Sequence, residues 1–417
     1  QRKFRYILID EFQDINQIQY DIIRMLAAPE NHLFIVGDDD QSIYRFRGAK
    51  PEIMLNFERD YPETEKILLD INYRSGSGIV KAAGNLISHN RTRFEKNIRP
   101  DQQTGIPVMT QGFVNQKEQN MAVIREIRKL HGEAGISYDQ IAVLFRTNAQ
   151  PGMLIRQLFD NNIPFVSREH LPNIYDHWIA ADIFAYLRLA QGENNRSLFL
   201  RVMNRPKRYL SRESLPYEQV KFDTWKDYYR DQGWMVQRLE KLRVDLEVIG
   251  KMRPFSAVNY IRKGIAYEDF LKDFAEYRKI PLDDLLDVLE EIHEDARGYE
   301  SCEAWFEHVE ELKREWEEQS VRKSISEPAI RLSTLHGAKG LEFEAVFLVD
   351  VNEKLMPYKK AVLDADLEEE RRMFYVGMTR AKQRFYLFWS RQIHNKEMEP
   401  SRFLAESGGG KEKKGCG

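Results

Sequence analysis

An apolar run that ends in two acids is the feature that most limits how this sequence can fold. Residues Tyr6 to Ile9 are apolar or aromatic, and Asp10 and Glu11 follow them directly. Such a run predicts a buried β-strand, and open α/β sheets bind their ligands at the carboxyl ends of their strands. We therefore predict a parallel α/β sheet with a polar site at its edge, although a solvated strand end would leave the same short pattern.

Strand-like and helix-like segments alternate along the first part of the chain. Short β-rich runs at residues 4–10, 32–38 and 65–73 are separated by helix-like segments at residues 17–26 and 51–60. This alternation is typical of a parallel sheet flanked by helices. Further apolar runs predict a second α/β domain that is built from two separate stretches of the chain. These runs are residues 108–113, 141–146, 330–335, 345–351 and 385–389.

The stretch inside that second domain, residues 197–327, has apolar side chains at the spacing of amphipathic helices. We predict a mostly α-helical insert whose apolar stripes form core contacts rather than a ligand site. The stripe residues are Leu282, Leu285, Leu286, Leu289, Ile292, Trp305, Val309, Leu312 and Trp316.

The composition is that of an ordinary soluble chain, with 42% hydrophobic and 31% charged residues. No apolar run approaches the ~18 residues that a membrane-spanning helix needs, and no signal peptide opens the chain. Cys302 and Cys416 cannot form a disulfide framework, and neither has the spacing of a metal ligand. We therefore predict a cytoplasmic protein without a membrane partner.

The net charge of −3 averages over two parts of the chain that differ in charge. Residues 283–318 hold fifteen acidic and three basic side chains, so the remainder of the chain is basic. One run of basic residues without acids has two interpretations, a nucleic-acid contact or a solvated helix face and loop. The run consists of Arg196, Arg201, Arg205, Lys207, Arg208 and Arg212.

A second polar motif, the loop from Val36 to Ala49, follows the acidic pair by about one helix and one strand. It contains Asp38 to Asp40 and then Gln41, whose amide can both donate and accept hydrogen bonds. The two motifs together are typical of a nucleotide hydrolase that moves on DNA. The phosphate-cradling sequence G-x-x-x-x-G-K-[S/T] does not occur, because neither of the two Gly-Lys pairs is followed by Ser or Thr. We therefore expect the chain to begin partway through its own ATPase.

Five polar motifs follow one another along the chain, at residues 10–14, 36–49, 72–75, 334–343 and 375–381. The last two read Thr-Leu-His-Gly-Ala-Lys-Gly-Leu-Glu-Phe and Tyr-Val-Gly-Met-Thr-Arg-Ala. In this order the motifs resemble those of the UvrD/Rep/PcrA-like superfamily 1 DNA helicases. The resemblance covers about residues 4 to 390 and is weakest in the helical insert.

The resemblance implies an α/β fold of RecA-like P-loop NTPase domains, in which helices flank parallel sheets, with a mostly α-helical inserted accessory domain. It divides the chain into the C-terminal part of a first RecA-like domain, a second RecA-like domain in two segments, the accessory insert and a flexible tail. The respective ranges are 1–75, 76–196 with 328–404, 197–327 and 405–417.

The resemblance also implies a catalytic centre for ATP and Mg²⁺. Asp10 would hold the Mg²⁺ through its water shell, and Glu11, which we also assign to the metal site, would polarise the attacking water. Gln41 would sense the γ-phosphate. Arg74 and Arg380 would act as two arginine fingers, because a guanidinium is a fixed positive fork that neutralises charge during phosphoryl transfer. A surface ion pair is the alternative role for any single arginine.

Three further residues would contact the nucleotide or connect the domains. Tyr73 would stack on the adenine, Glu342 would touch the ribose end of the nucleotide, and His336 would help to couple the two domains. Each of these assignments follows from the resemblance and from the position of the residue within a motif.

A single-stranded DNA surface is predicted from aromatic and basic side chains in the second motif. Tyr44 and Phe46 flank Arg45, and aromatic rings suit single-stranded DNA because every base offers a face for stacking. Arg47 and Thr334 would touch the strand or its phosphates. Many relatives carry Trp at the position of Phe46, and a core position is the alternative for this ring. None of these contacts reads base edges, so we expect little sequence preference.

The function implied by the resemblance is that of an ATP-dependent, 3′-to-5′ single-stranded DNA translocase and DNA helicase in DNA repair or replication. Its partners would be single-stranded DNA, junctions of single- and double-stranded DNA, and repair or replication proteins. We predict that this chain alone is inactive, because it lacks the phosphate-binding loop. Two alternatives are a non-hydrolysing DNA-binding or regulatory protein and the motor part of a helicase-nuclease.

Overall fold

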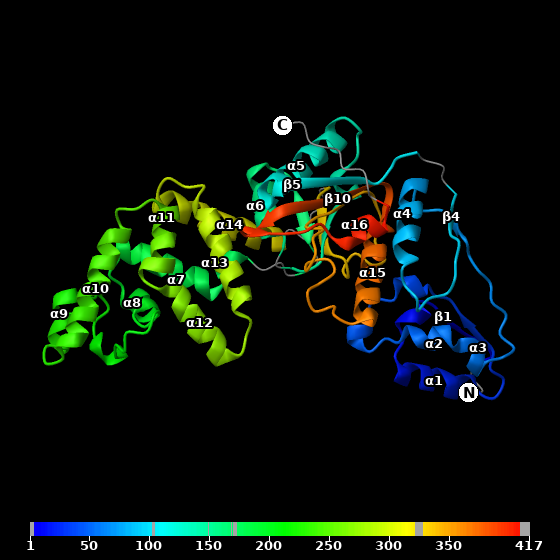
Figure 1. Cartoon of the computed structure of the whole chain (residues 1–417), viewed down its shortest axis with the longest axis horizontal. Helices are drawn as coiled ribbons and strands as arrows, with labels where there is room; N and C mark the ends of the chain where they lie inside the picture. The colour runs from blue at the N-terminus through cyan, green and yellow to red at the C-terminus, as the bar shows by residue number, and fades with distance from the viewer. Residues whose placement is uncertain are drawn as a thin grey trace. The chain divides into compact units, whose positions relative to one another are not determined.

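The computed structural model of the chain describes residues 4–101, 105–148, 150–167, 169, 173–321 and 328–408. The chain divides into two compact units, an α/β unit of residues 1–171 and 326–417 and a helical unit of residues 172–325. Figure 1 shows the helices and strands of both. The predicted α/β fold with a mostly helical insert is confirmed.

A seven-stranded sheet forms the centre of the α/β unit (Figure 1). Its strands lie in the order β11-β10-β9-β6-β8-β7, and β5 pairs with residues 386–392 of β10. Every pairing is parallel except that of β10 with β11. The sheet therefore takes strands from both of the separate stretches that carry the predicted apolar runs. Its strands are β5 (Met109–Asn115), β6 (Ile141–Phe145), β7 (Phe165–Ser167), β8 (Ile330–Thr334), β9 (Phe343–Leu348), β10 (Ala381–Ile393) and β11 (Lys396–Glu397).

Helices that pack against the sheet explain why its inner strands have continuous apolar sequences. All five residues of β6 are buried, as expected of a parallel strand covered on both faces. Side chains of α4, α15 and α16 share one hydrophobic core with β6, β9 and β10, while α5 packs against β5, β10 and α6. The helices are α4 (Ser77–Ile87), α5 (Gln116–Gly132), α6 (Gly152–Asp160), α15 (Asp364–Met378) and α16 (Arg402–Glu406).

The N-terminal region of the α/β unit forms a separate parallel pair, β1 (Ile7–Ile9) with β2 (Leu33–Ile35). The helix between them, α1 (Gln17–Ala27), begins with a capping box at Asn16 and Gln19. The predicted strand at 65–73 is reduced to β3 (Ile71–Asn72), which pairs in parallel with β4 (Arg99–Pro100). The short helical elements are η1 (Phe12–Asp14), η2 (Asp39–Gln41), η3 (Arg45–Arg47), α2 (Pro51–Leu55) and α3 (Phe57–Asp60).

The prediction that the first strand is buried is wrong for one of its faces. Leu8 and Phe34 lie side by side on β1 and β2 and are 70% and 57% exposed, and Tyr6 and Val36 beside them are exposed as well. We call these four residues the open sheet face. The opposite face of the pair packs against Phe12 and its neighbours. The apolar sequence of β1 therefore fits a strand with two covered faces, whereas the described residues cover only one.

The helical unit contains the predicted apolar stripes on two of its helices. Leu285, Leu289 and Ile292 are buried on α13, and Trp305 and Val309 are buried on α14; the side chain of Trp316 lies outside the described residues. The helices are α7 (Trp178–Ala190), α8 (Arg196–Val202), α9 (Phe222–Tyr228), α10 (Gly233–Ile249), α11 (Pro254–Asn259), α12 (Tyr267–Arg278), α13 (Leu282–Ala296) and α14 (Cys302–Val321), with a π-helical turn, η7, at Tyr260–Gly264.

Two of the predicted boundaries differ from what the structure describes. The helical unit begins near residue 172, because α7 packs with α8, α10 and α13, whereas the predicted insert begins at 197. Ala405 and Glu406 complete α16 instead of starting a tail, and residues 409–417 of the predicted tail lie outside the described residues. Among the described helices, none is both long and apolar enough to cross a bilayer.

The core of the helical unit gives a test of its packing. Leu289 on α13 is fully buried, so Leu289→Ala should lower the free energy of unfolding by about 2–5 kcal/mol. Asp283→Ala, at an exposed position of the same helix, should change it by no more than about 0.5 kcal/mol. Urea unfolding followed by circular dichroism measures both, and equal losses would show that α13 does not pack as described.

Candidate active site

The acidic pair lies where β1 ends. Glu11 has a left-handed backbone with φ of 52°, a conformation that costs a non-glycine residue roughly 1–2 kcal/mol. Its carboxylate accepts a hydrogen bond from Gln13 Nε2 at 2.6 Å, and Asp10 Oδ1 accepts one from the Glu11 backbone N–H at 2.8 Å. Both side chains remain exposed. Backbone strain of this kind is typical of functional positions.

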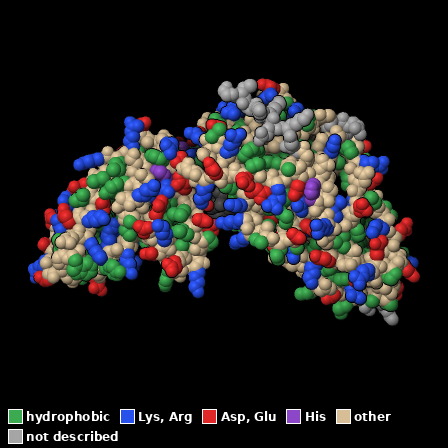
Figure 2. Space-filling view, in the orientation of Figure 1, with side chains coloured by type: hydrophobic (Ala, Val, Ile, Leu, Met, Phe, Trp, Pro, Cys, Tyr) green, Lys and Arg blue, Asp and Glu red, His purple; other side chains and the backbone are tan. Residues whose placement is uncertain are grey.

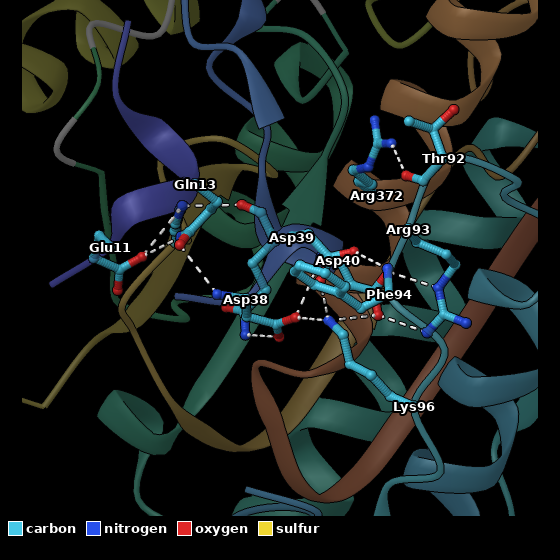
Figure 3. A network of polar contacts seen from close by, with 12 residues as sticks. Glu11, Gln13, Asp38, Asp39, Asp40, Thr92, Arg93, Phe94, Lys96 and Arg372 are labelled. Carbon is cyan, nitrogen blue, oxygen red and sulfur yellow. Dashed lines mark hydrogen bonds and ion pairs between the residues drawn. The ribbon is translucent and has the colours of Figure 1, made fainter. Parts of the chain in front are cut away.

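Gln13, which the sequence did not single out, connects the acidic pair to the Gln41 loop (Figure 3). Gln13 is buried; its amide donates to Glu11, and its side-chain oxygen accepts from the Asp38 backbone N–H at 3.0 Å. A Cβ atom on Gly37 would lie 2.5 Å from that same oxygen. Glycine at position 37 therefore permits the close approach of the backbone after β2 to Gln13.

Gln41 sits between an acceptor and a donor. Its Nε2 donates to Asp38 Oδ2 at 2.7 Å, and its Oε1 accepts from Arg380 Nη2 at 3.3 Å. Its backbone carbonyl accepts from Lys339 Nζ at 2.9 Å. The structure thus brings together Gln41 and Arg380, two of the predicted catalytic residues.

Arg380 is a buried cation with no carboxylate bound to it among the described residues. Arg380 is 1% exposed, and its guanidinium donates to the carbonyls of Val376 and Leu341 and to Thr379 Oγ1. Burial and the nearby Arg74 guanidinium lower the pKa of Arg380 to about 10. The side chain therefore stays charged at neutral pH, in a position where an added anion would be attracted.

Arg74 pairs with Glu342, so the structure brings a predicted finger next to a predicted ribose contact. Arg74 Nε lies 2.6 Å from Glu342 Oε1. The backbone N–H of Arg74 donates to Asn72 Oδ1, which fixes the turn after β3. Tyr73, which lies between Asn72 and Arg74 in sequence, is 67% exposed.

Lys339 lies inside the motif at residues 334–343, although the sequence alone indicates no role for it. Its side chain is 9% exposed, bonds Asp14 and the Gln41 carbonyl, and lies 3.5 Å from Glu11 Oε2. Its ammonium also lies 5.1 Å from the centre of the Tyr44 ring. Lys339 therefore joins the acidic strand end, the Gln41 loop and the predicted DNA surface.

The predicted DNA surface is partly assembled in the structure. Phe46 is 65% exposed, its ring centre is 6.0 Å from that of Tyr44, and the Arg47 guanidinium lies within 5.4 Å of both rings. Thr334, by contrast, is buried, and the Glu169 carboxylate accepts from both its hydroxyl and its backbone N–H. Phe46 is therefore not a core ring, whereas Thr334 offers little surface to a ligand in this state.

Three aspartates of the Gln41 loop surround one lysine (Figure 3). The carboxylates of Asp38, Asp39 and Asp40 lie close enough together to hold a cation, and the Lys96 ammonium bonds all three. The Lys96 charge thus takes the position of a metal ion in this cluster. The exposed carboxylates of Asp10 and Glu11 suit Mg²⁺ better, because this ion binds through one or two carboxylates and keeps several waters.

Most of the basic run in the helical unit has structural partners. Arg201 and Arg205 pair with the buried Asp182, and Arg208 is buried against backbone carbonyls. Arg196 also donates to a carbonyl. Figure 2 shows acidic and basic side chains interspersed over the viewed face of this unit. Of the two interpretations of the run, this pairing favours a structural role for these four arginines.

Family models match both parts of the chain. The model described as the UvrD/REP helicase N-terminal domain matches residues 1–62, and the UvrD-like helicase C-terminal domain matches residues 67–217 and 268–392. The second model alone covers more than half of the sequence. The chain belongs to the UvrD-like helicase family.

Curated relatives of this UvrD-like chain include proteins named as helicases. The ATP-dependent DNA helicase PcrA of Bacillus subtilis is 32% identical over 97% of this chain and 58% of its own length. The ATP-dependent DNA helicase Rep of Buchnera aphidicola is 29% identical over 97% and 66%, and YjcD of Bacillus subtilis is 33% identical over 97% and 54%. The UvrD-like chain thus spans roughly half to two-thirds of the length of these relatives.

His336, in the motif at residues 334–343, contacts the predicted DNA surface. Its ring centre lies 5.2 Å from that of Phe46, edge to face. Burial first, and then the charge of Arg146, lowers the pKa of His336 to about 4, against opposing effects of Glu370 and the Ile43 backbone. His336 is therefore neutral at physiological pH in this UvrD-like chain.

The low pKa of His336 predicts a pH dependence of stability. Between about pH 6.5 and about pH 4 the unfolded chain binds a proton at His336 that the folded chain does not, so acid lowers the free energy of unfolding. His336→Gln removes this contribution, which amounts to at most about 3 kcal/mol. Urea unfolding of both proteins at pH 7.5 and pH 4.5 measures it. An identical loss in both proteins would contradict the low pKa.

Proposed function

We propose that this chain belongs to an ATP-dependent, 3′-to-5′ single-stranded DNA translocase and DNA helicase, and that it supplies the catalytic residues outside the phosphate-binding loop. The observation that carries the proposal is the buried guanidinium of Arg380, which has Gln41 and Arg74 beside it but no carboxylate partner among the described residues. Two like charges in one desolvated place raise the electrostatic energy of the site. The phosphates of ATP are anions that would lower it.

Phosphoryl transfer needs positioning and charge neutralisation more than covalent chemistry by the protein. Arg380 and Arg74 would bind the phosphate oxygens as charge develops on them, and Arg74 would exchange its ion pair with Glu342 for a contact to the nucleotide. The exposed ring of Tyr73 would stack on the adenine. The amide of Gln41 would then register whether the γ-phosphate is present.

Asp10 and Glu11 have the oxygen donors that a Mg²⁺ ion accepts. When bound, the ion would neutralise charge on the phosphate oxygens. Glu11 would accept a proton from the attacking water, because its carboxylate is exposed and held near Gln13. The polarity of movement and the action in repair or replication rest on the family resemblance alone.

The DNA surface of the proposal is formed by Tyr44, Phe46 and Arg47. An exposed ring next to a guanidinium can stack on any base, while the cation attracts the backbone phosphates. Thr334 would join this surface only after Glu169 releases its hydroxyl. Single-stranded DNA and its junctions with duplex are therefore the proposed partners.

The open sheet face supports the proposal that the first RecA-like domain needs further strands. Leu8 and Phe34 are large apolar side chains on a two-stranded sheet, which is marginally stable without additional packing. A segment that adds strands to β1 or β2, packs a helix on this face and carries a G-x-x-x-x-G-K-[S/T] loop would cover Leu8 and Phe34 and complete the nucleotide site. We therefore expect this chain alone to be inactive.

The proposal is tested by ATP hydrolysis with and without single-stranded DNA. The assay compares this chain with a polypeptide extended upstream of Gln1 by a segment containing the phosphate-binding loop. The extended polypeptide should show DNA-stimulated turnover, and Arg380→Ala should lower its kcat at least about a hundredfold. Arg391→Ala, at an exposed arginine of β10, is the control and should have no effect. Normal turnover of the Arg380 variant would refute the role of Arg380 as a finger.

The variant Glu11→Gln tests the catalytic role of Glu11 separately from the binding of single-stranded DNA. Glu11→Gln keeps the shape of the side chain but removes the negative charge that activates water. Turnover of the extended polypeptide should fall at least about a hundredfold while binding of single-stranded DNA is retained. Unchanged turnover in this variant would show that another residue serves as the base.

The DNA surface can be tested in the chain as it stands. Phe46→Ala should weaken binding of a single-stranded oligonucleotide by about 1–3 kcal/mol, whereas Phe46→Trp should preserve or strengthen it. Tyr277→Ala, which removes an 82% exposed ring from α12, is the control. Fluorescence anisotropy measures all four proteins, and equal affinities for wild type and Phe46→Ala would exclude stacking at this ring.

One observation fits a second candidate function. The exposed ring of Phe46 beside Arg47 could bind single-stranded DNA without any nucleotide chemistry, so a DNA-binding or regulatory protein without ATP hydrolysis would have the same surface. It would bind single-stranded DNA normally, but no upstream segment would restore turnover. The proximity of Gln41, Arg74 and Arg380 favours the hydrolase.

A further inference from the structure

Asp38 is a carboxylate shared between a buried lysine and the amide of Gln41. Its Oδ1 lies 2.5 Å from Lys96 Nζ, and its Oδ2 accepts from Gln41 Nε2 at 2.7 Å. Each carboxylate oxygen therefore has its own partner. Lys96 is far from Gln41 in sequence, but Asp38 alone separates the two side chains in this chain of contacts. Figure 3 shows Lys96 against Asp38.

The two neighbours of the Gln41 side chain allow only one orientation of its amide. An ionised carboxylate can only accept hydrogen bonds, so the NH₂ group must face Asp38. A guanidinium can only donate, so the amide oxygen must face Arg380. The NH₂ group has two hydrogens, and only one is used by Asp38; the other has no acceptor among the described residues. That second N–H is available to a phosphate oxygen or a water.

Lys96 keeps Asp38 in the ionised form that this orientation requires. The Lys96 side chain is 8% exposed and bonds three carboxylates. Burial raises the pKa of Asp38, but the charge and hydrogen bond of Lys96 outweigh burial and lower it. Burial lowers the pKa of Lys96, and the carboxylates of Asp38, Asp40 and Asp39 raise it further than burial lowers it.

The segment that carries Lys96 is fixed at both ends. Arg372 on α15 donates to the Thr92 carbonyl at 3.0 Å, and Arg93 makes a two-fold hydrogen bond to Asp40. Farther along, Arg99 and Pro100 pair with β3, directly before Tyr73. One segment therefore holds both the Gln41 loop and the strand that leads to the predicted adenine contact.

We propose that Asp38, held by Lys96, is a positioning residue that sets the orientation of the Gln41 amide for contact with the γ-phosphate. The proposal rests on the function proposed above for Gln41. Asp38 and Lys96 do not touch the reacting atoms; they act through Gln41. Asp40 and Arg93 belong to the same cluster but have no side-chain contact with Gln41, so they provide matched controls.

The isosteric substitution Asp38→Asn changes the orientation of the Gln41 amide without changing the size of the side chain at position 38. In Asp38→Asn, the new amide keeps its oxygen toward Lys96, so its NH₂ group faces Gln41. Gln41 must then turn its oxygen to position 38 and its NH₂ toward Arg380, where two donors repel. Asp40→Asn removes the same charge from the surroundings of Lys96 without changing the partners of Gln41.

Thermal unfolding of this chain tests the network without ATP. Because Asp38 and Gln41 are in contact, the losses in Tm from Asp38→Asn and Gln41→Ala should not add; the double variant should lose less than their sum by about 2 °C or more. The losses from Asp40→Asn and Gln41→Ala should add. Additive losses for the Asp38 pair overturn the proposal, whether or not the chain hydrolyses ATP.

Turnover of the extended polypeptide tests the consequence for catalysis. Asp38→Asn should lower kcat by about tenfold to a hundredfold with KM for ATP changed less than about twofold, and Asp40→Asn should leave kcat within about twofold. Lys96→Arg should retain most of the activity that Lys96→Met loses, because the positive charge is kept. Equal kcat values for the Asp38 and Asp40 variants overturn the positioning role.

The two proposals can fail separately. If Gln41→Ala leaves turnover unchanged, the assigned role of Gln41 fails, and with it the catalytic part of the inference. If Gln41→Ala lowers turnover but Asp38→Asn does not, the proposed function stands and the inference alone is overturned. If both variants lower kcat and the double variant is no slower than Gln41→Ala, Asp38 acts through Gln41 as proposed.

Discussion

The need to balance buried charge determines how the residues around Gln41 are arranged. Lys96, Lys339 and Arg380 all place cationic groups where little water reaches, and such groups require negative or carbonyl oxygens. The loop after β2 supplies oxygens to all three, through its aspartates, through the Gln41 backbone and through the Gln41 side chain. Three cations from distant parts of the sequence therefore hold this loop, in addition to the packing of Ile43, which is fully buried in the core of the large sheet.

Sequence patterns predicted the parts of the fold in which hydrophobic burial decides the structure. The run at 141–145 is entirely apolar and became an inner strand buried along its whole length, and the helical stripe containing Leu289 became a buried face of α13. The same logic misjudged Leu8, because its apolar sequence indicates a covered strand whatever segment provides the cover. Periodicity shows which side chains need burial, but it does not identify the residues that bury them.

Motif order placed Gln41, Arg74, Glu342 and Arg380 in one site, and the structure brings them together; their roles remain predictions. The residues that hold these four side chains and their neighbours in place had no predicted role. Lys96 and Glu169, which contact Asp38 to Asp40 and Thr334 respectively, lie outside all five motifs. Gln13 lies inside the acidic motif but had no assigned role. Ion pairs and hydrogen bonds between residues so far apart depend on the tertiary fold, and local sequence spacing does not predict them. Lys339 and Gln13, which both lie inside polar motifs, gave signals that could have been followed.

The strand order of the large sheet has a consequence for how the chain folds during synthesis. Among the described residues, β6 pairs with β8 and β9, and β5 pairs with β10, yet all three partners follow the helical unit in sequence. The edges of β5 and β6 therefore stay unpaired while the ribosome synthesises α7 to α14. The contacts among these helices are comparatively local in sequence. The helical unit can complete its own core first, whereas β5 and β6 are exposed to misassociation until the last strands emerge.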